Sequence, residues 1–134
     1  MKHILKTITI LFIVSLTLTS CSKDDNSTTQ DSIIGQWIAK EQLDNGEKIL
    51  PTDCDKKTEL NFKADGSLDA TFAYDNDGEC ITGSVNGTWV SKGGNKYSYT
   101  LKDSEDEETY NLTLANDEIT IDLEGGLYSI FSRK

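Results

Sequence analysis

The sequence predicts an all-β protein whose folded part is an up-and-down antiparallel barrel of eight strands. From Ile33 onward, apolar and polar residues alternate with a period of two, which places alternate side chains on opposite faces of a strand. Turn residues separate the alternating runs by short connections, and short connections favour antiparallel neighbours. No helical periodicity occurs after residue 20. Eight strands can close into a barrel, which removes the sheet edges. A two-sheet sandwich is the competing architecture.

Each strand is identified by its alternating apolar residues. The first contains Gly35-Gln36-Trp37, and a long link with the only proline, Pro51, follows it. Residues 58–74 form a hairpin around the turn at residues 64–66. The later strands contain Val85, Gly87 and Trp89; Tyr97, Tyr99 and Leu101; Tyr110, Leu112 and Leu114; Ile119, Ile121 and Leu123; and residues 127–131.

The first 20 residues have the character of a secretory signal. Lys2 and Lys6 make a short positive segment, and an apolar run over residues 8–18 follows it. The run is too short to span a bilayer as a helix, which needs about 20 residues. It ends in Leu18-Thr19-Ser20-Cys21, which resembles the bacterial lipobox. The resemblance implies cleavage before Cys21 and acylation of this cysteine. The alternative is an ordinary signal with a chance cysteine, which leaves an odd thiol in a secreted protein.

Residues 21–31 are predicted to form the acylated cysteine and a flexible linker. Residues 22–31 contain no apolar side chain, so they cannot bury enough surface to become ordered. Acyl chains on Cys21 would insert into membrane lipid and anchor the protein without crossing the bilayer. The segment Ser22–Asp25 resembles the acidic export signal of surface lipoproteins. We therefore expect a lipid-anchored protein of the outer membrane, displayed on the cell surface, with a periplasm-facing anchor as the alternative. The barrel domain is expected over residues 32–134.

Composition excludes several classes of function. Removing Lys2 and Lys6 with the signal changes the formal net charge from −10 to −12. A chain this acidic is a poor partner for nucleic acid or for anionic lipid. The only histidine, His3, also lies in the signal. The mature chain therefore has no imidazole for a Ser-His-Asp or Cys-His catalytic site or for a zinc site. We expect no enzyme and no cofactor.

Two cysteines remain after Cys21, namely Cys54 and Cys80. In an oxidising compartment they are expected to pair, and two reactive thiols are the alternative. The bond would close a loop of 25 intervening residues, which contributes about 3–4 kcal/mol in the chain-entropy model.

Two short motifs suggest a family. The Gly35-Gln36-Trp37 sequence on the first of eight strands resembles the Gly-x-Trp signature of lipocalins, and Gly87-Thr88-Trp89 is similar to a second motif of such domains. Residues 33–134 resemble the short lipocalin-like domains of bacterial lipoproteins. The resemblance implies that Trp37 packs at the closed end of the barrel under an arginine of the last strand, which would be Arg133. In contrast to a typical lipocalin, the domain is expected to be shorter and to have no helix after its last strand.

The expected activity is the binding of a small apolar or amphipathic molecule at the open barrel end. An eight-stranded barrel is either filled by its own side chains or holds one small ligand. The predicted inward-facing set is Trp37, Leu60, Phe62, Leu68, Phe72, Tyr74, Trp89, Tyr97, Tyr99, Leu101, Tyr110, Leu112, Leu114, Ile119, Ile121 and Leu123. The candidate ligand-binding residues are Phe72, Tyr74, Tyr97, Tyr99 and Tyr110, and plain core packing is the alternative for them.

No metal site is expected. Residues 103–108 contain five acids in six residues, which is typical of a solvated turn; calcium binding is the alternative. Residues 75–79 fail the ligand spacing of a calcium loop and are instead expected to form a turn next to Cys80. A second hypothesis for function is a protein-binding module, such as an inhibitor of a basic hydrolase or a subunit of an envelope assembly.

Overall fold

The computed structural model describes residues 32–102 and 107–134. The predicted signal, the lipid site at Cys21 and the linker up to residue 31 lie outside the described residues, as does most of the acidic turn that begins at residue 103. Within the described ranges, no helix is long and apolar enough to cross a membrane.

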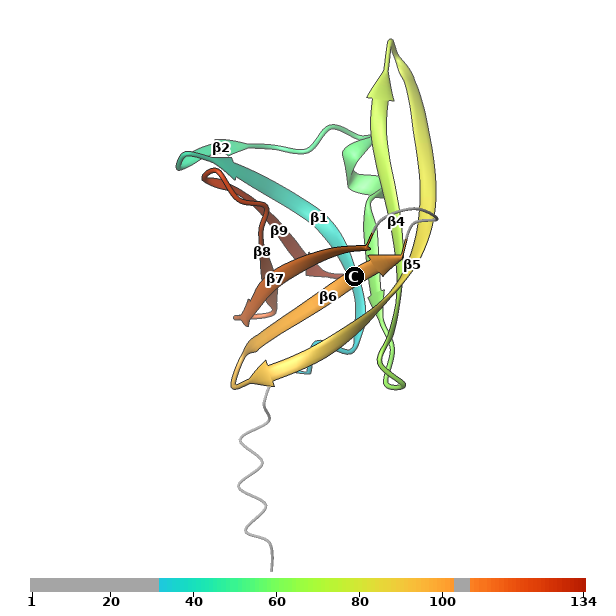
Figure 1. The fold of residues 1–134 in the computed structure, drawn as a ribbon. Coiled ribbons are helices and arrows are strands. Elements are labelled where there is room, and N and C mark those ends of the chain that lie inside the picture. The colour runs from blue at the N-terminus through green and yellow to red at the C-terminus, as the bar shows by residue number, and fades with distance from the viewer. Residues whose placement is uncertain (1–31, 103–106) are drawn as a thin grey trace, which may run out of the picture.

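The described residues form one antiparallel sheet that closes into a barrel (Figure 1). The strands are β1 (Gly35–Asp44), β2 (Glu47–Ile49), β3 (Glu59–Phe62), β4 (Ser67–Asn76), β5 (Glu79–Gly93), β6 (Lys96–Lys102), β7 (Glu107–Ala115), β8 (Glu118–Asp122) and β9 (Leu127–Arg133). From β3 to β9 each strand pairs with the next in the sequence, and β1 pairs with both β3 and β9. Eight strands thus form the closed ring, and the predicted barrel is confirmed over the sandwich.

The segment predicted to be a plain link after the first strand contains two further elements. The short strand β2 pairs with the outer end of β1 through Gln42↔Ile49 to Asp44↔Glu47, and the 3-10 turn η1 spans Asp55–Lys57. Sequence alternation did not reveal β2 because all three of its residues are exposed and it has no buried face. The strand forms because Asn45 and Gly46 adopt φ values of 49° and 87°, which a two-residue hairpin turn requires.

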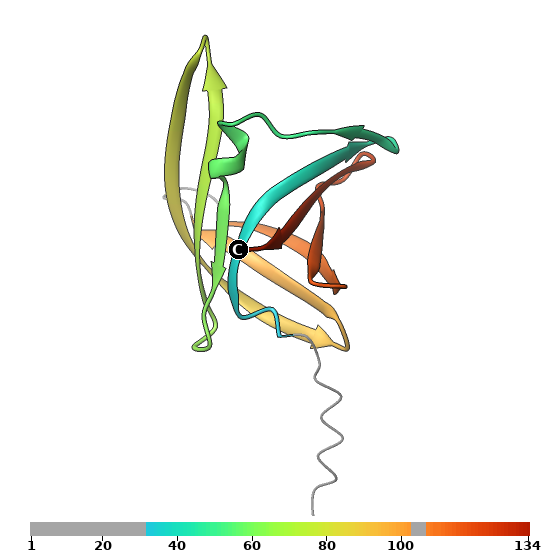
Figure 2. The same ribbon diagram turned by 180° about the vertical axis from the view of Figure 1, so that it is seen from behind.

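The ribbon made by β4 and β5 extends beyond the barrel (Figures 1 and 2). The β3–β4 pairing ends at Glu59↔Thr71, whereas β4 and β5 stay paired as far as Asn76↔Glu79. The prediction that Tyr74 lies on a dry face is therefore wrong, and Phe72 faces the inside of the barrel without being fully covered. Phe72 is 36% exposed and Tyr74 is 57% exposed, because the strand continues past the wall that would cover them.

The hydrophobic core is packed inside the barrel. Its fully buried large side chains are Trp37, Phe62, Ile33, Leu60, Leu68, Ile119 and Ile121. Trp89, Tyr110 and Leu123, which were predicted to face inward, pack against this cluster but remain partly exposed. Four aromatic rings are joined by three edge contacts: Phe62 lies 6.2 Å from Trp89 and 6.1 Å from Tyr99, and Trp89 lies 6.0 Å from Tyr97. Such edge-to-face pairs add to the stabilisation from burial.

The second Gly-x-Trp motif is explained by close packing between β5 and β6. A Cβ atom on Gly87 would lie 2.3 Å from the carbonyl oxygen of Thr100 on β6. Only glycine allows this approach, and it places Trp89 where its indole N–H donates a 2.8 Å hydrogen bond to the carbonyl of Lys63.

We predict that Gly87→Ala destabilises the barrel by at least about 1–3 kcal/mol, because backbone atoms rather than a flexible side chain occupy the space. Gly83→Ala is the matched control in the same strand: a Cβ atom there meets nothing within 4 Å, so the change should stay within about 0.5 kcal/mol. Urea unfolding followed by circular dichroism measures both. Equal midpoints for the two variants would contradict the close-packing explanation.

Candidate functional site

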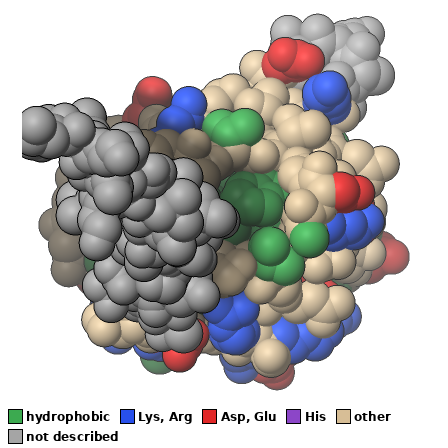
Figure 3. All heavy atoms as spheres, turned by 90° about the horizontal axis from the view of Figure 1, so that it is seen from below, with side chains coloured by type: hydrophobic (Ala, Val, Ile, Leu, Met, Phe, Trp, Pro, Cys, Tyr) green, Lys and Arg blue, Asp and Glu red, His purple; other side chains and the backbone are tan. Residues whose placement is uncertain are grey.

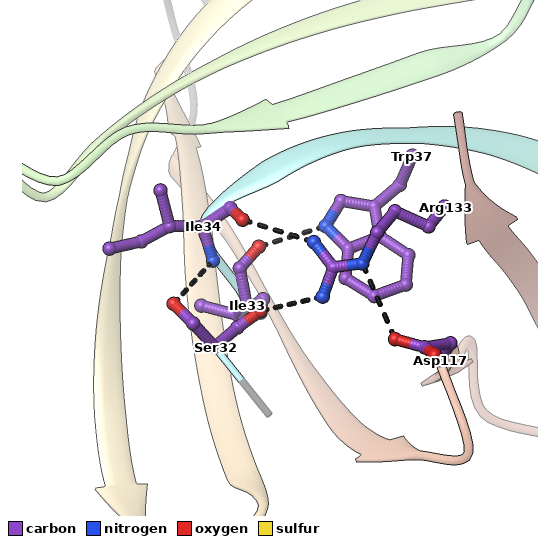
Figure 4. Close-up of polar contacts among 6 residues, drawn as sticks. All are labelled: Ser32, Ile33, Ile34, Trp37, Asp117 and Arg133. Carbon is purple, nitrogen blue, oxygen red and sulfur yellow. Dashed lines mark hydrogen bonds and ion pairs between the residues drawn. The ribbon is translucent and has the colours of Figure 1, made fainter. Parts of the chain in front are cut away.

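The closed end of the barrel is built around Trp37, which is completely buried (Figure 4). Its indole N–H donates a 2.8 Å hydrogen bond to the carbonyl of Ile33. This bond ties the segment before β1 across the base of the barrel. A buried indole needs such a partner, because an unpaired polar group inside a protein is costly.

Arg133 at the end of β9 covers the ring of Trp37 (Figure 4). Its guanidinium carbon lies 4.3 Å from the ring centroid, so the contact implied by the lipocalin resemblance is present. The guanidinium also donates hydrogen bonds to the carbonyls of Ile34 at 3.1 Å and Ser32 at 2.9 Å, and it forms a 3.4 Å ion pair with Asp117. One planar side chain therefore seals the base by contacting the first segment, β1 and the β7–β8 turn.

The backbone conformation and the limited space at position 35 explain why the signature has glycine there. The φ angle of Gly35 is +136°, which side-chain-bearing residues rarely adopt, and an added Cβ would lie 2.9 Å from the Nη1 atom of Arg133. The motif thus combines a backbone position that makes room for the arginine with a ring, two residues later, on which the arginine lies.

Seen from below, hydrophobic side chains gather in one small area of the face that the grey atoms leave visible (Figure 3). Lys, Arg, Asp and Glu side chains are interspersed around this area (Figure 3). Because positive and negative side chains are mixed here, this face has no surface of one charge sign that would attract a charged macromolecule.

A cavity of about 290 Å³ lies at the opposite, open end of the barrel. A β-bulge in β1 between Ala39 and Glu41 makes space for it. Below the bulge β1 pairs with β3, and above it β1 pairs with β2 instead. Because bulges bend and twist a strand, the upper end of β1 diverges from β4, and the link over residues 50–58 spans the gap (Figures 1 and 2).

The cavity wall is mainly apolar with a few polar groups. Its apolar side includes Ile49, Leu50, Phe72, Ile121, Leu123 and Phe131. Gln42 and Ser129 are neighbours across β1 and β9, and the Gln42 amide donates a 3.3 Å hydrogen bond to the Ser129 hydroxyl. An apolar concave wall with a few polar groups that fix orientation is the usual composition of a small-molecule site.

A disulfide fixes the position of the link that forms part of the cavity wall. Cys54, in the link, is bonded to Cys80 on β5, as the sequence predicted. Leu50, Pro51, Asp55 and Thr58 of the same link line the cavity. The bond therefore fixes the link against the projecting β4–β5 ribbon and restricts the shape of the opening.

Two stacked tyrosines also line the cavity. Tyr99 and Tyr110 are direct partners on β6 and β7, with ring centroids 5.2 Å apart. The Tyr110 hydroxyl donates a hydrogen bond to the Glu108 carboxylate, which together with burial raises the pKa of Tyr110 to about 12. Burial, and to a lesser degree Tyr110 and Glu108, raises the pKa of Tyr99 well above its usual range. A phenol is uncharged at neutral pH in any case, and the raised pKa values extend this uncharged state further into the alkaline range.

Of the predicted ligand-binding residues, the structure brings Phe72, Tyr99 and Tyr110 together at this cavity. Tyr97 lies instead in the lower core beside Trp89, and Tyr74 lies on the projecting ribbon outside the cavity wall. Sequence reasoning missed Gln42, Ser129 and the residues of the link. Gln42 faces inward only because the bulge shifts the alternation of β1 by one residue, and nothing in the sequence indicates that bulge.

A family model described as a lipocalin-like domain matches residues 33–121, which is most of the folded part. No curated protein and no solved structure matches the chain.

We predict that Trp37→Ala lowers the free energy of unfolding by about 3–5 kcal/mol, because it removes a fully buried ring from the base. Trp37→Phe should cost about 1–3 kcal/mol, since phenylalanine keeps most of the packing but leaves the Ile33 carbonyl without its donor. Urea titration followed by circular dichroism gives both values.

Asp117→Asn is the control for this site, because it removes the exposed ion pair to Arg133 and leaves the ring contact intact. It should change stability by no more than about 1 kcal/mol. A Trp37→Ala midpoint equal to that of Asp117→Asn would show that the base does not depend on the indole.

Proposed function

This chain belongs to the family of lipocalin-like domains, and on that premise we propose that it binds one small apolar or amphipathic molecule at the open end of its barrel. The observation that carries the proposal is the cavity of about 290 Å³ between β1, β9 and the link. Ligand pockets are typically about 300–1,000 Å³, so the site suits a small ligand. The closed end supplies stability and leaves the open end free for binding.

We predict that the full chain binds N-phenyl-1-naphthylamine, a neutral apolar fluorophore, with saturable 1:1 stoichiometry. Ala39→Phe should weaken this binding by more than about tenfold, because Ala39 lines the cavity and the larger ring fills it. Ile38→Phe, on the neighbouring residue that does not line the cavity, is the matched control. Fluorescence titration measures the affinities.

Circular dichroism establishes that each of these variants is folded. Gln42→Trp, at an exposed position of the cavity wall, gives a second way to block the site if Ala39→Phe does not fold. Undiminished binding in folded Ala39→Phe and Gln42→Trp would refute the proposed site.

The second candidate function is a protein-binding module. Exposed apolar side chains favour it: Leu50 is 70% exposed, Tyr74 57% and Ile49 46%. Ile49 and Leu50 also border the cavity, so the two candidates share a surface. Blocking the cavity with Ala39→Phe separates them, because this change removes small-molecule binding but leaves the exposed rim unaltered.

We also propose that the protein is anchored to the outer membrane, facing the cell surface, through lipid on Cys21. The support is the lipobox resemblance of residues 18–21 and the acidic segment after it. Two or more acyl chains give stable anchoring.

We predict that Cys21→Ala abolishes metabolic labelling with palmitate and releases the protein from the membrane fraction. Cys80→Ala, which removes a cysteine outside the lipobox, should keep both the label and the membrane location. Labelling that persists in Cys21→Ala would contradict the assignment of this residue.

A further inference from the structure

The charge of the open-end cavity has one sign. Among the described residues that line it, Glu41 and Asp55 carry carboxylates, and none is Lys, Arg or His. A third carboxylate, that of Glu108, accepts the hydrogen bond from the lining residue Tyr110. The cavity therefore offers negative and neutral groups to a ligand.

Two lysines near the cavity form ion pairs, and one of these pairs is with Glu41 of the wall itself. Among the described residues, Asp55 is therefore the lining carboxylate that no ion pair balances. Lys48 lies 2.6 Å from Glu41, and its side chain is 57% exposed. Lys56, next to Asp55, pairs with Asp53 at 2.8 Å. The Asp55 carboxylate is held by the backbone N–H and hydroxyl of Thr52, at 2.9 and 2.8 Å. Hydrogen bonds from neutral donors fix this charge in place without cancelling it.

We infer that the cavity selects neutral or cationic amphiphiles and rejects anionic ones such as fatty-acid carboxylates, an inference that rests on the proposed ligand-binding function. An anionic head group would lose water beside the Asp55 carboxylate, and the nearby Lys48 is already paired with Glu41. A hydroxyl head group can bond to Gln42, Ser129 or the neutral phenols of Tyr99 and Tyr110. An ammonium head group is attracted by the carboxylates and by the faces of the stacked rings.

The test uses three probes with the same ten-carbon chain and different head groups: decanol, decyltrimethylammonium and decanoate. Each displaces bound N-phenyl-1-naphthylamine from the full chain at neutral pH, below the concentration at which it forms micelles. We expect decanoate to bind at least about tenfold more weakly than decanol, and decyltrimethylammonium to bind at least as well as decanol.

A charge substitution locates the selectivity. Gln42→Lys puts a cation in the cavity wall and should raise the affinity for decanoate relative to decanol by about tenfold. Gln36→Lys is the matched control, because it makes the same change at an exposed position near the closed end of the same strand. It should leave the ratio unchanged.

Decanoate binding as tightly as decanol would overturn the inference. So would an equal effect of Gln36→Lys and Gln42→Lys, because the net charge of the protein rather than the cavity would then set the preference. Failure of N-phenyl-1-naphthylamine to bind at all would instead refute the proposed function, so the two failures are distinguishable.

Discussion

Pairing between β1 and β9 is the interaction on which the rest of the structure depends. It joins the first and last strands of the ring from Trp37↔Arg133 to Asp44↔Leu127, and without it the sheet would have two open edges. The same register places Arg133 opposite Trp37, so closing the sheet also forms the seal of the base. The bulge that opens the cavity lies in this pairing too, between Ala39 and Glu41. Closure, seal and cavity therefore come from one pair of strands.

The two ends of the barrel are held together by different kinds of contact. At the base, each polar group of the Trp37–Arg133 cluster has a partner, and both glycines of the motifs are fixed by close contacts. At the open end, part of the wall is formed by a link that a disulfide holds in place, and the rest by paired strands. Substitutions at the base should therefore act on stability, whereas substitutions at the open end should act on binding. This separation lets a domain of about 100 residues, with a single modest core, combine stability with an open cavity.

Strand positions could be predicted from the sequence because most ring strands have one buried face. Alternation marks β3, the start of β4 and β6 to β8, since a one-residue slip would expose their apolar sets. The same reasoning failed where a strand leaves the wall or has no dry face. Tyr74 continues the alternation of β4 yet lies on the projecting ribbon, and β2 has only exposed residues. The two-residue alternation shows on which face of a strand a side chain lies. It does not show whether the neighbouring strand extends far enough to cover that side chain.

The candidate site was less predictable for a related reason. Tyr99 and Tyr110 could be found from the sequence because they belong to regular strands, whereas Gln42, Ser129 and Leu50 depend on a bulge and on the path of a link. These irregular features set the chemistry of the cavity. The bulge turns Gln42 rather than Glu41 toward Ser129, and the link contributes Asp55. A change in the link could therefore alter the ligand without altering the barrel, because loops held by a rigid scaffold tolerate substitution better than its core.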